Sequence, residues 1–488
     1  MDGSAMTVST REPGTAGASN HAASTGRVLT SLGLCTLLPA LGNSIANVAL
    51  PTLASAFDAS FQQMQWVVIA YLLASTALVV SVGRLGDMLG RRRLLLAGIS
   101  LFTLASMLCG VAPTLGLLIA ARAAQGLAAA VMLALAMALV GEAIPKARTG
   151  SAMGMLGTMS AVGTALGPTL GGVLIAGLGW RAIFLVNLPL GVAAYFLARR
   201  CLPADRQATP ARQSGFDIPG TLLIALTLGA YALAMTWGRG SFDWRNTGLL
   251  LAAALGVALF VLVETKVEFP LIRLARLRDP ILRAGLVTSA LVSTVVMTTL
   301  VVGPFYLFMA LGLDTARVGL VMSVGPVFSA LTGLPAGRLV NQRGAGRMVV
   351  AGLLAMFAGC LALCFAPTSW GVVAYAVPIA VIAAGYALFQ AANNTAVMAD
   401  VSPDQRGVVS DMLNLCRNLG LITGASAMGA VFAMASGTVA FTTEHPESVG
   451  SGLHATFAVA AVLVSVALLV SWTGQSRTQR TVGDGNRS

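Results

Sequence analysis

The chain has 488 residues, of which 56% are hydrophobic and 10% are charged, and its formal net charge is +12. A soluble chain of this length would form several domains, with about a quarter of their residues charged. The scarcity of charge excludes that class, so the basic excess has to be examined as a membrane-topology signal before a nucleic-acid partner is considered.

Residue counts exclude further mechanisms. The two lysines, Lys146 and Lys266, follow no glycine-rich phosphate loop, which excludes ATP-driven pumping by this chain. The three histidines lie in segments expected to be a tail or outer loops, so haem ligation is not expected. The six cysteines are scattered and are expected to be buried free thiols. No metal site and no cofactor are predicted.

Long charge-free runs predict membrane-spanning helices, because a helix needs about 20 apolar residues to cross the hydrocarbon core. In chain order the runs are 28–57, 59–83, 94–121, 123–141, 149–180, 182–198, 218–238, 246–263, 284–313, 318–337, 348–399 and 448–476. The run 348–399 is too long for one span and divides near Pro367. The runs on either side of Arg122 form one helix from about Leu115 to Glu142. Another span lies between Arg406 and Ala435, which makes 14 spans.

Basic residues sort to one side of the predicted membrane. Alternate loops and both tails carry 24 of the 30 lysines and arginines, the opposite loops carry 4, and Arg122 and Arg417 lie within spans. By the positive-inside rule, both termini are cytoplasmic, and the basic excess implies no nucleic-acid partner. The tails, 1–27 and 474–488, are predicted to be disordered.

The predicted fold class is an all-α membrane protein of 14 transmembrane helices, arranged as two six-helix bundles with two linker helices. The first bundle covers residues 28–200, the linker spans 218–265 and the second bundle 281–473. Each bundle carries a similar loop between its second and third spans, Gly83–Arg93 and Gly337–Arg347. Two homologous six-helix halves indicate a transporter rather than a receptor or an enzyme.

Four segments of the first bundle carry specific patterns: Gly83–Arg93, Leu118–Gly126, Gly163–Gly172 and Trp180–Pro189. Together they resemble the major facilitator superfamily, in particular its fourteen-span drug:proton antiporter branch, over about residues 28–475. The resemblance implies a multi-pass protein of the bacterial cell (inner) membrane that exchanges a small-molecule substrate for protons. The lipid bilayer is its surrounding partner, and a periplasmic adaptor is left open.

The loop Gly83–Arg93 is similar to the family's latch signature. Its latch residues are Gly83, Asp87, Gly90 and Arg91. The resemblance implies that Asp87 accepts hydrogen bonds in one conformation only and locks the two bundles in the outward-facing state. The alternative is a generic loop acid. Met88 departs from the family's usual arginine, and Asn341 replaces the aspartate in the second copy.

Arg122 matches the family's fourth-span arginine, which is associated with proton coupling. An arginine in the hydrocarbon region is costly, so it should face the bundle interior and find polar partners. The alternative is a side chain that extends to the outer surface, because Arg122 lies about seven residues into its predicted helix.

The fifth span carries the pattern that marks antiporters in this superfamily. Its residues are Gly163, Gly167, Pro168, Gly171 and Gly172. Small residues let a neighbouring helix backbone approach closely, and a proline kinks its helix. Tight packing alone is the alternative.

The first span departs from the drug:proton pattern, because Gly42 and Asn43 stand where an acid is common. This departure argues against the usual proton site and against a preference for cationic drugs. Asp411 is then the one carboxylate predicted inside a span, and it shares a helical face with Asn414 and Asn418. We therefore predict proton coupling by Arg122 and Asp411; a position in water at the cytoplasmic mouth is the alternative for Asp411.

A substrate cavity is expected near the midplane, between the two bundles. The predicted lining residues are Asn43, Asn47, Tyr71, Phe305, Tyr306, Phe389, Gln390, Asn393, Asn394 and Asn414. The predicted function is multidrug efflux: proton-coupled export of hydrophobic or amphiphilic molecules by alternating access. The alternatives are a dedicated transporter of a single metabolite and a membrane sensor or scaffold that transports nothing.

Overall fold

The structure is a computed structural model that describes residues 15–79, 81–144, 146–203, 205, 218–237, 243–265, 279–399, 401, 406–437 and 446–485. Every secondary-structure element in these ranges is helical. Within them, 14 segments are long and apolar enough to cross a membrane. The predicted all-α class and number of spans are confirmed.

The first bundle contains six spans and two additional short helices. The spans are α1 (Thr15–Val48), α3 (Phe61–Val79), α5 (Arg91–Val111), α6 (Leu115–Ala143), α7 (Lys146–Leu178), and α8 (Ala182–Leu185) with α9 (Asn187–Cys201). The short helices α2 (Leu50–Phe57) and α4 (Val82–Leu89) follow the first and second spans. Arg122 therefore lies inside one continuous helix, as predicted.

The linker helices form a hairpin. They are α10 (Ile218–Thr236) and α11 (Trp244–Glu264). Asn246 joins them, because its side-chain amide donates to the carbonyl oxygens of Ala234 at 2.7 Å and Trp237 at 2.9 Å. Only 11% of the α11 span is buried, which leaves most of its apolar surface for lipid.

The second bundle has more interrupted helices. Its spans are α12 (Pro280–Phe305) with a π-helical turn (Tyr306–Ala310), α13 (Thr315–Met322) with α14 (Val324–Arg343), α15 (Ala345–Cys364), α16 (Gly371–Met398), α17 (Arg406–Thr423) with a π-helical turn (Gly424–Met428) and α18 (Gly429–Ala435), and α19 (Pro446–Gly485). A short 3₁₀ helix, Thr368–Trp370, separates α15 from α16, as the break near Pro367 predicts.

The ends of the chain differ from the predicted disordered tails. Helix α1 begins at Thr15 and α19 continues to Gly485, so residues 15–27 and 474–485 are helical. Extending an existing helix avoids the cost of nucleation. Residues 1–14 and 486–488 lie outside the described residues.

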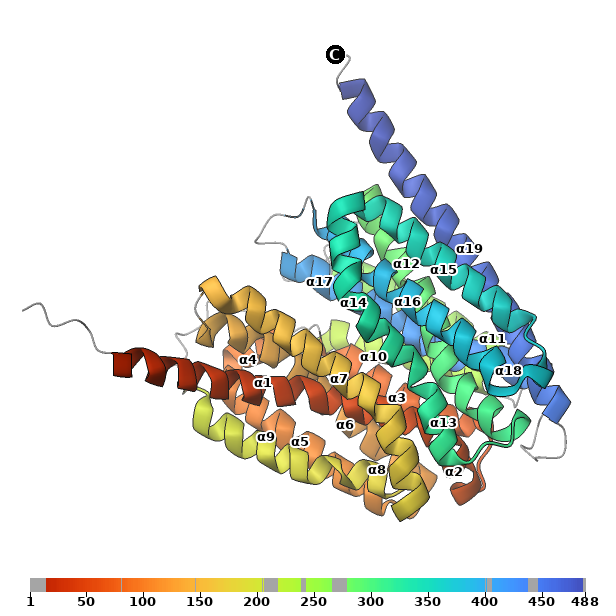
Figure 1. Cartoon of the computed structure of the whole chain (residues 1–488), viewed down its shortest axis with the longest axis horizontal. Coiled ribbons are helices and arrows are strands. Elements are labelled where there is room, and N and C mark those ends of the chain that lie inside the picture. Colours follow the sequence, from red (N-terminus) through yellow and green to blue (C-terminus); the bar gives the residue numbers. More distant parts are fainter. Residues whose placement is uncertain are drawn as a thin grey trace, which may run out of the picture.

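The two bundles meet at one end of the molecule and diverge toward the other (Figure 1). The end where they meet carries the first turn of α3, the last turn of α12 and α13, and we call it the closed end. The opposite end carries the loop between α4 and α5 and the loop between α14 and α15, and we call it the latch end. Helix α10 contacts both bundles, because Trp66 of α3 donates to Thr236 at 3.1 Å and Tyr231 donates to Thr423 of α17 at 3.2 Å.

Close packing inside the first bundle gives a stability prediction. A Cβ at Gly126 of α6 would overlap the backbone carbonyl of Tyr71 in α3, whereas a Cβ at Gly141 of the same helix meets nothing within 4 Å. Gly126→Ala should lower the free energy of unfolding by about 1–3 kcal/mol, since overpacking displaces backbone. Thermal unfolding of the purified protein measures this. Gly141→Ala is the matched control and should not destabilise; equal melting temperatures for both variants would contradict the packing.

Candidate functional site

A cavity of about 180 Å³ lies between the two bundles. Helices α1, α3, α6 and α7 of the first bundle supply one wall, and α12 and α17 of the second bundle supply the other. Its polar lining residues are Asn43, Ser44, Asn47, Tyr71, Ser75, Ser160, Thr164, Arg417 and Asn418. Because each bundle supplies one wall, movement of one bundle against the other must reshape this cavity.

Two asparagines of α1 give this cavity unpaired hydrogen-bonding groups. The Asn47 side chain is 1% exposed, and neither its oxygen nor its nitrogen has a partner in the described part of the chain. The Asn43 side-chain oxygen also lacks one there. Leaving a buried polar group unpaired costs about 1–3 kcal/mol, so both amides are poised to bond a ligand or water.

Arg417 is the charged residue of the described cavity lining. It lies on the face of α17 that also carries Asn418 and Leu421, about two turns before the π-helical segment. No hydrogen bond or ion pair of its guanidinium is found among the described residues. The sequence had marked Arg417 as a charge within a span but gave it no position in the cavity.

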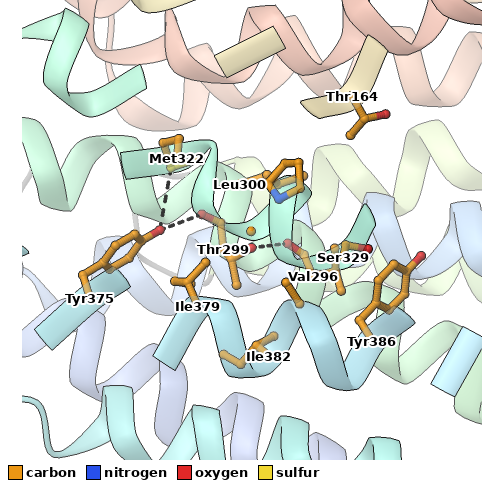
Figure 2. A pocket seen from close by; sticks show the side chains of 13 residues that line it. Thr164, Val296, Thr299, Leu300, Met322, Ser329, Tyr375, Ile379, Ile382 and Tyr386 are labelled. Carbon is orange, nitrogen blue, oxygen red and sulfur yellow. Dashed lines mark hydrogen bonds between the residues drawn. The ribbon is translucent and has the colours of Figure 1, made fainter. Parts of the chain in front are cut away.

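A second cavity of about 110 Å³ adjoins the first, because Thr164 and Leu300 line both. Figure 2 shows Tyr375, Ile379, Ile382 and Tyr386 along one side of α16 facing it. The Tyr375 hydroxyl donates to the Thr299 carbonyl at 3.3 Å, within the second bundle. The aliphatic side chains and aromatic rings leave a mostly apolar surface toward this cavity, which sequence patterns did not single out.

Arg122 is fully buried inside the first bundle rather than extended to the outer surface. Its guanidinium donates to the carbonyl oxygens of Val67 at 2.9 Å and Gly42 at 3.1 Å, and to the Gln125 side chain at 2.5 Å. It also lies over the Tyr71 ring, 4.5 Å from the centroid. These bonds join α1, α3 and α6, and within the described residues no carboxylate pairs with Arg122.

The missing acid of the first span falls beside this arginine. A side chain at Gly42 would point toward the amides of Gln125 and Asn187, whose nitrogens lie 3.6 and 3.8 Å from the position of its Cβ. The Gln125 amide donates to Ser106 of α5 at 2.7 Å. At the position where the drug:proton pattern has an acid, this chain therefore has no carboxylate, and the groups around the buried Arg122 are neutral.

Asn43, Asn47 and Tyr71 line the first cavity, as expected, but other predicted residues lie elsewhere. Asn393 is buried within the second bundle and donates to the Gly285 carbonyl of α12 at 3.2 Å. Phe389 is buried and packs against Gly352 of α15. Both stabilise the second bundle internally, which differs from their predicted place in the cavity lining.

The remaining predicted residues divide between the two ends of the molecule. Phe305 and Tyr306 are buried at the closed end. Four residues of α16 and α17 lie outside both cavity linings, with partly or fully exposed side chains: Gln390, Asn394, Asp411 and Asn414. Asn418, the third residue of the predicted face of α17, does line the first cavity, whereas Asp411 and Asn414 lie one to two turns nearer the start of the helix.

The glycines of α7 contact two different helices. Gly163, Gly167 and Gly171 face α1, where an added Cβ would meet backbone or side-chain atoms of Leu37, Ser44 and Ile45. Gly172 instead faces α13 of the second bundle. A Cβ there would lie 2.8 Å from the Thr315 carbonyl oxygen and 3.1 Å from the Gly319 Cα.

Two further groups join the bundles at the closed end. Thr169, next to Pro168, hydrogen-bonds to Ser323 between α13 and α14. Phe61 packs edge-on against Phe305, with ring centroids 4.8 Å apart, and against Phe432 at 5.3 Å. The closed end is therefore sealed by both backbone contact and aromatic packing.

The latch residues make their described side-chain contacts within the first bundle. Arg91 binds Asp87 at 2.9 Å and Glu142 of α6 at 2.6 Å. Asp205, which no sequence pattern singled out, accepts from the backbone N–H groups of Arg92 at 2.8 Å and Arg93 at 3.2 Å. It therefore caps α5 beyond Gly90, whose φ of +93° suits glycine.

The family model described as Major Facilitator Superfamily matches residues 32–425. Riboflavin transporter RibZ of Clostridioides difficile is 31% identical over 395 residues, which cover 80% of this chain and 85% of that protein. Multidrug resistance protein Stp of Mycobacterium tuberculosis is 33% identical over 410 residues, 83% of this chain and 75% of that protein.

A solved structure of a bacterial homologue of the human lysosomal transporter Spinster, inward-facing and occupied, has the same fold. Its TM-score is 0.67 at 16% identity, and the match covers 93% of this chain and 97% of that chain.

The contact between Gly172 and α13 gives a conformational prediction. Gly172→Ala should destabilise the closed end by about 1–3 kcal/mol and shift the population toward separation there, since each 1.4 kcal/mol changes an equilibrium tenfold. Pulsed electron paramagnetic resonance between labels at the exposed Ser55 and Leu320 measures it, after the six native cysteines are replaced.

The matched control for this variant is Gly177→Ala, in the same helix, where an added Cβ meets nothing within 4 Å. It should leave the distance distribution unchanged. An unchanged distribution in Gly172→Ala as well would refute a role for this contact in closing the molecule.

Proposed function

Because this chain belongs to the Major Facilitator Superfamily, we propose that it is a proton-coupled antiporter that exports hydrophobic or amphiphilic small molecules by alternating access. The main support for this proposal is the cavity between the bundles. Helices α1, α3, α6 and α7 form one of its walls, and α12 and α17 form the opposite one. The similarity to a multidrug resistance protein supports efflux of this kind.

The orientation follows from charge. The set of alternate loops and tails that carries 24 of the 30 basic residues belongs to the latch end, which we assign to the cytoplasm, with both chain termini, in a bacterial cell membrane. The cavity is then closed toward the outside by Gly172 and Phe61 and their partners. In the opposite state the latch residues around Asp87 would contact the second bundle, and the contact between α7 and α13 would open.

Proton entry supplies the energy for export. One proton that crosses a potential of 100 mV releases about 2.3 kcal/mol. We assign the proton to Asp411, a carboxylate in the first turn of the span Val408–Ala435. Arg122 stays charged at all relevant pH values, so its role is to hold α1, α3 and α6 and to set the positive potential beside the cavity.

A dedicated transporter of a single metabolite is the second candidate. The absence of an acidic side chain at Gly42 and the similarity to a riboflavin transporter favour it. Transport assays on one panel of chemically diverse compounds separate the two: a single transported compound supports the dedicated transporter, and several unrelated ones support multidrug efflux.

Coupling can be tested in proteoliposomes under an imposed pH gradient. Arg122→Ala should slow transport about tenfold or more, because it leaves buried carbonyl groups unpaired, at about 1–3 kcal/mol. Asp411→Asn should remove the dependence on the gradient while transport down a substrate gradient continues. Asp58→Asn, an exposed acid at the closed end, is the control and should change neither rate. Unchanged gradient-driven transport in both variants would show that the coupling assignment is wrong.

Efflux can be tested in the cells that produce the protein. Deletion of its gene should raise the steady-state accumulation of at least one amphiphilic fluorescent compound, and dissipating the proton-motive force should remove the difference. The control is complementation with wild type at a verified membrane level. Equal accumulation across a broad compound panel would count against export.

A further inference from the structure

The cavity between the bundles is electropositive. Arg417 is the charged residue among the described residues that line either cavity, and neither lining contains an aspartate or glutamate. An arginine remains protonated in proteins. In the hydrocarbon region of a membrane such a charge needs a polar or anionic partner, and the described residues supply none to Arg417.

A second arginine, Arg122, adds to the positive potential of the cavity, although it does not line the cavity itself. Tyr71 lines the cavity, and the Arg122 guanidinium lies over its ring, 4.5 Å from the centroid. The described neighbours of Arg122 are carbonyl, amide and aromatic groups, which leave its charge uncompensated. Asp411, in the first turn of its span, is exposed on α17 outside both linings. The charge nearest to the cavity is therefore cationic, and a low dielectric attenuates its field little, which makes the potential in the cavity positive.

The unpaired amides add the hydrogen bonds that an oxyanion needs. Asn47 is 1% exposed with both side-chain atoms unpaired in the described part of the chain, and it lines the same cavity as Arg417. Its N–H₂ group can donate beside the guanidinium, and the unpaired Asn43 oxygen can accept from a hydroxyl or N–H group of the same ligand. Charge-assisted bonds of this kind are the strong ones in recognition.

The adjoining cavity supplies a mostly apolar surface. Thr164 and Leu300 are common to both cavities, so the polar space around Arg417 continues into the space beside Ile382, Tyr375 and Tyr386. A ligand that fills both has a charged or strongly polar end and an aliphatic or aromatic body.

From this arrangement we propose that the substrate is an amphiphilic organic anion, whose carboxylate, sulfonate or phenolate is bound by Arg417 and Asn47 and whose apolar body lies against α16. The inference rests on the proposed transport function and specifies the substrate class of the same site. It contrasts with a site built around a carboxylate, which would select cationic compounds.

Binding of matched pairs tests the charge preference directly. The probes are 2-naphthoate, anthracene-9-carboxylate and pyrene-1-carboxylate, each paired with its neutral primary amide. Equilibrium dialysis against the full-length protein in nanodiscs, with empty nanodiscs subtracted, measures affinity without any gradient. At least one carboxylate should bind tenfold or more tightly than its amide, which corresponds to about 1.4 kcal/mol.

Variants then assign the preference to Arg417. Arg417→Gln should reduce the ratio of carboxylate to amide affinity to about one, and Arg417→Lys should retain part of it, since the charge remains. Arg283→Gln, which removes an exposed arginine of α12 outside both cavity linings, is the control and should keep the wild-type ratio. Unfolding temperatures verify that each variant is folded.

Three results would overturn the proposal: no carboxylate binds above the empty nanodiscs, amides bind as tightly as carboxylates to wild type, or Arg417→Gln keeps the wild-type ratio. The wild-type ratio decides the matter even if Arg417→Gln does not fold. Anion binding without gradient-driven transport would contradict the proposed function but would support the anionic substrate class. Gradient-driven transport of neutral compounds alone would support the proposed function and contradict the anionic substrate class.

Discussion

Close backbone approach along α7 determines how the rest of this molecule can be arranged. Lipid gives helices little hydrophobic reason to associate, so their contact depends on packing and on small residues. Three glycines of α7 hold α1 in the first bundle, and Gly172 holds α13 of the second bundle. The first contact joins helices of one bundle, and the second joins surfaces that would part in the proposed alternating-access cycle. The same helix supplies Ser160 and Thr164 to the cavity, so the seal and the site share one element.

The two arginines inside the spans have contrasting surroundings. Arg122 is fully buried, and its bonds to Val67, Gly42 and Gln125 come from helices of a single bundle. Arg417 lines the space between bundles with its guanidinium unpaired among the described residues. The bonds of Arg122 lie within one bundle and would be kept if the bundles moved against each other. The guanidinium of Arg417 is instead available to a ligand in the cavity between them. This difference decides which arginine can select a substrate.

Much of the fold could be predicted from the sequence because span length and loop charge are local properties. The division near Pro367 and the continuity of α6 through Arg122 follow from such patterns. The part of α17 that reaches the cavity could not be predicted, since it depends on where along the helix its neighbours pack. Asp411 and Asn414 consequently lie outside the described cavity linings although Asn418 of the same face lines one, and Asn393 serves the packing of its own bundle. Asp205 caps α5 across more than a hundred residues of sequence, a pairing that no local pattern indicates.

Helix α10 has a consequence for the range of motion. It is hydrogen-bonded to Trp66 of the first bundle and to Thr423 of the second, through two hydroxyls on one helix. Each such bond contributes about 0.5–1.5 kcal/mol, and a rigid helix cannot follow two bodies that rotate apart. In the proposed alternating-access cycle, helix α10 would therefore act as a tether, because each cycle would have to break and remake one of these bonds.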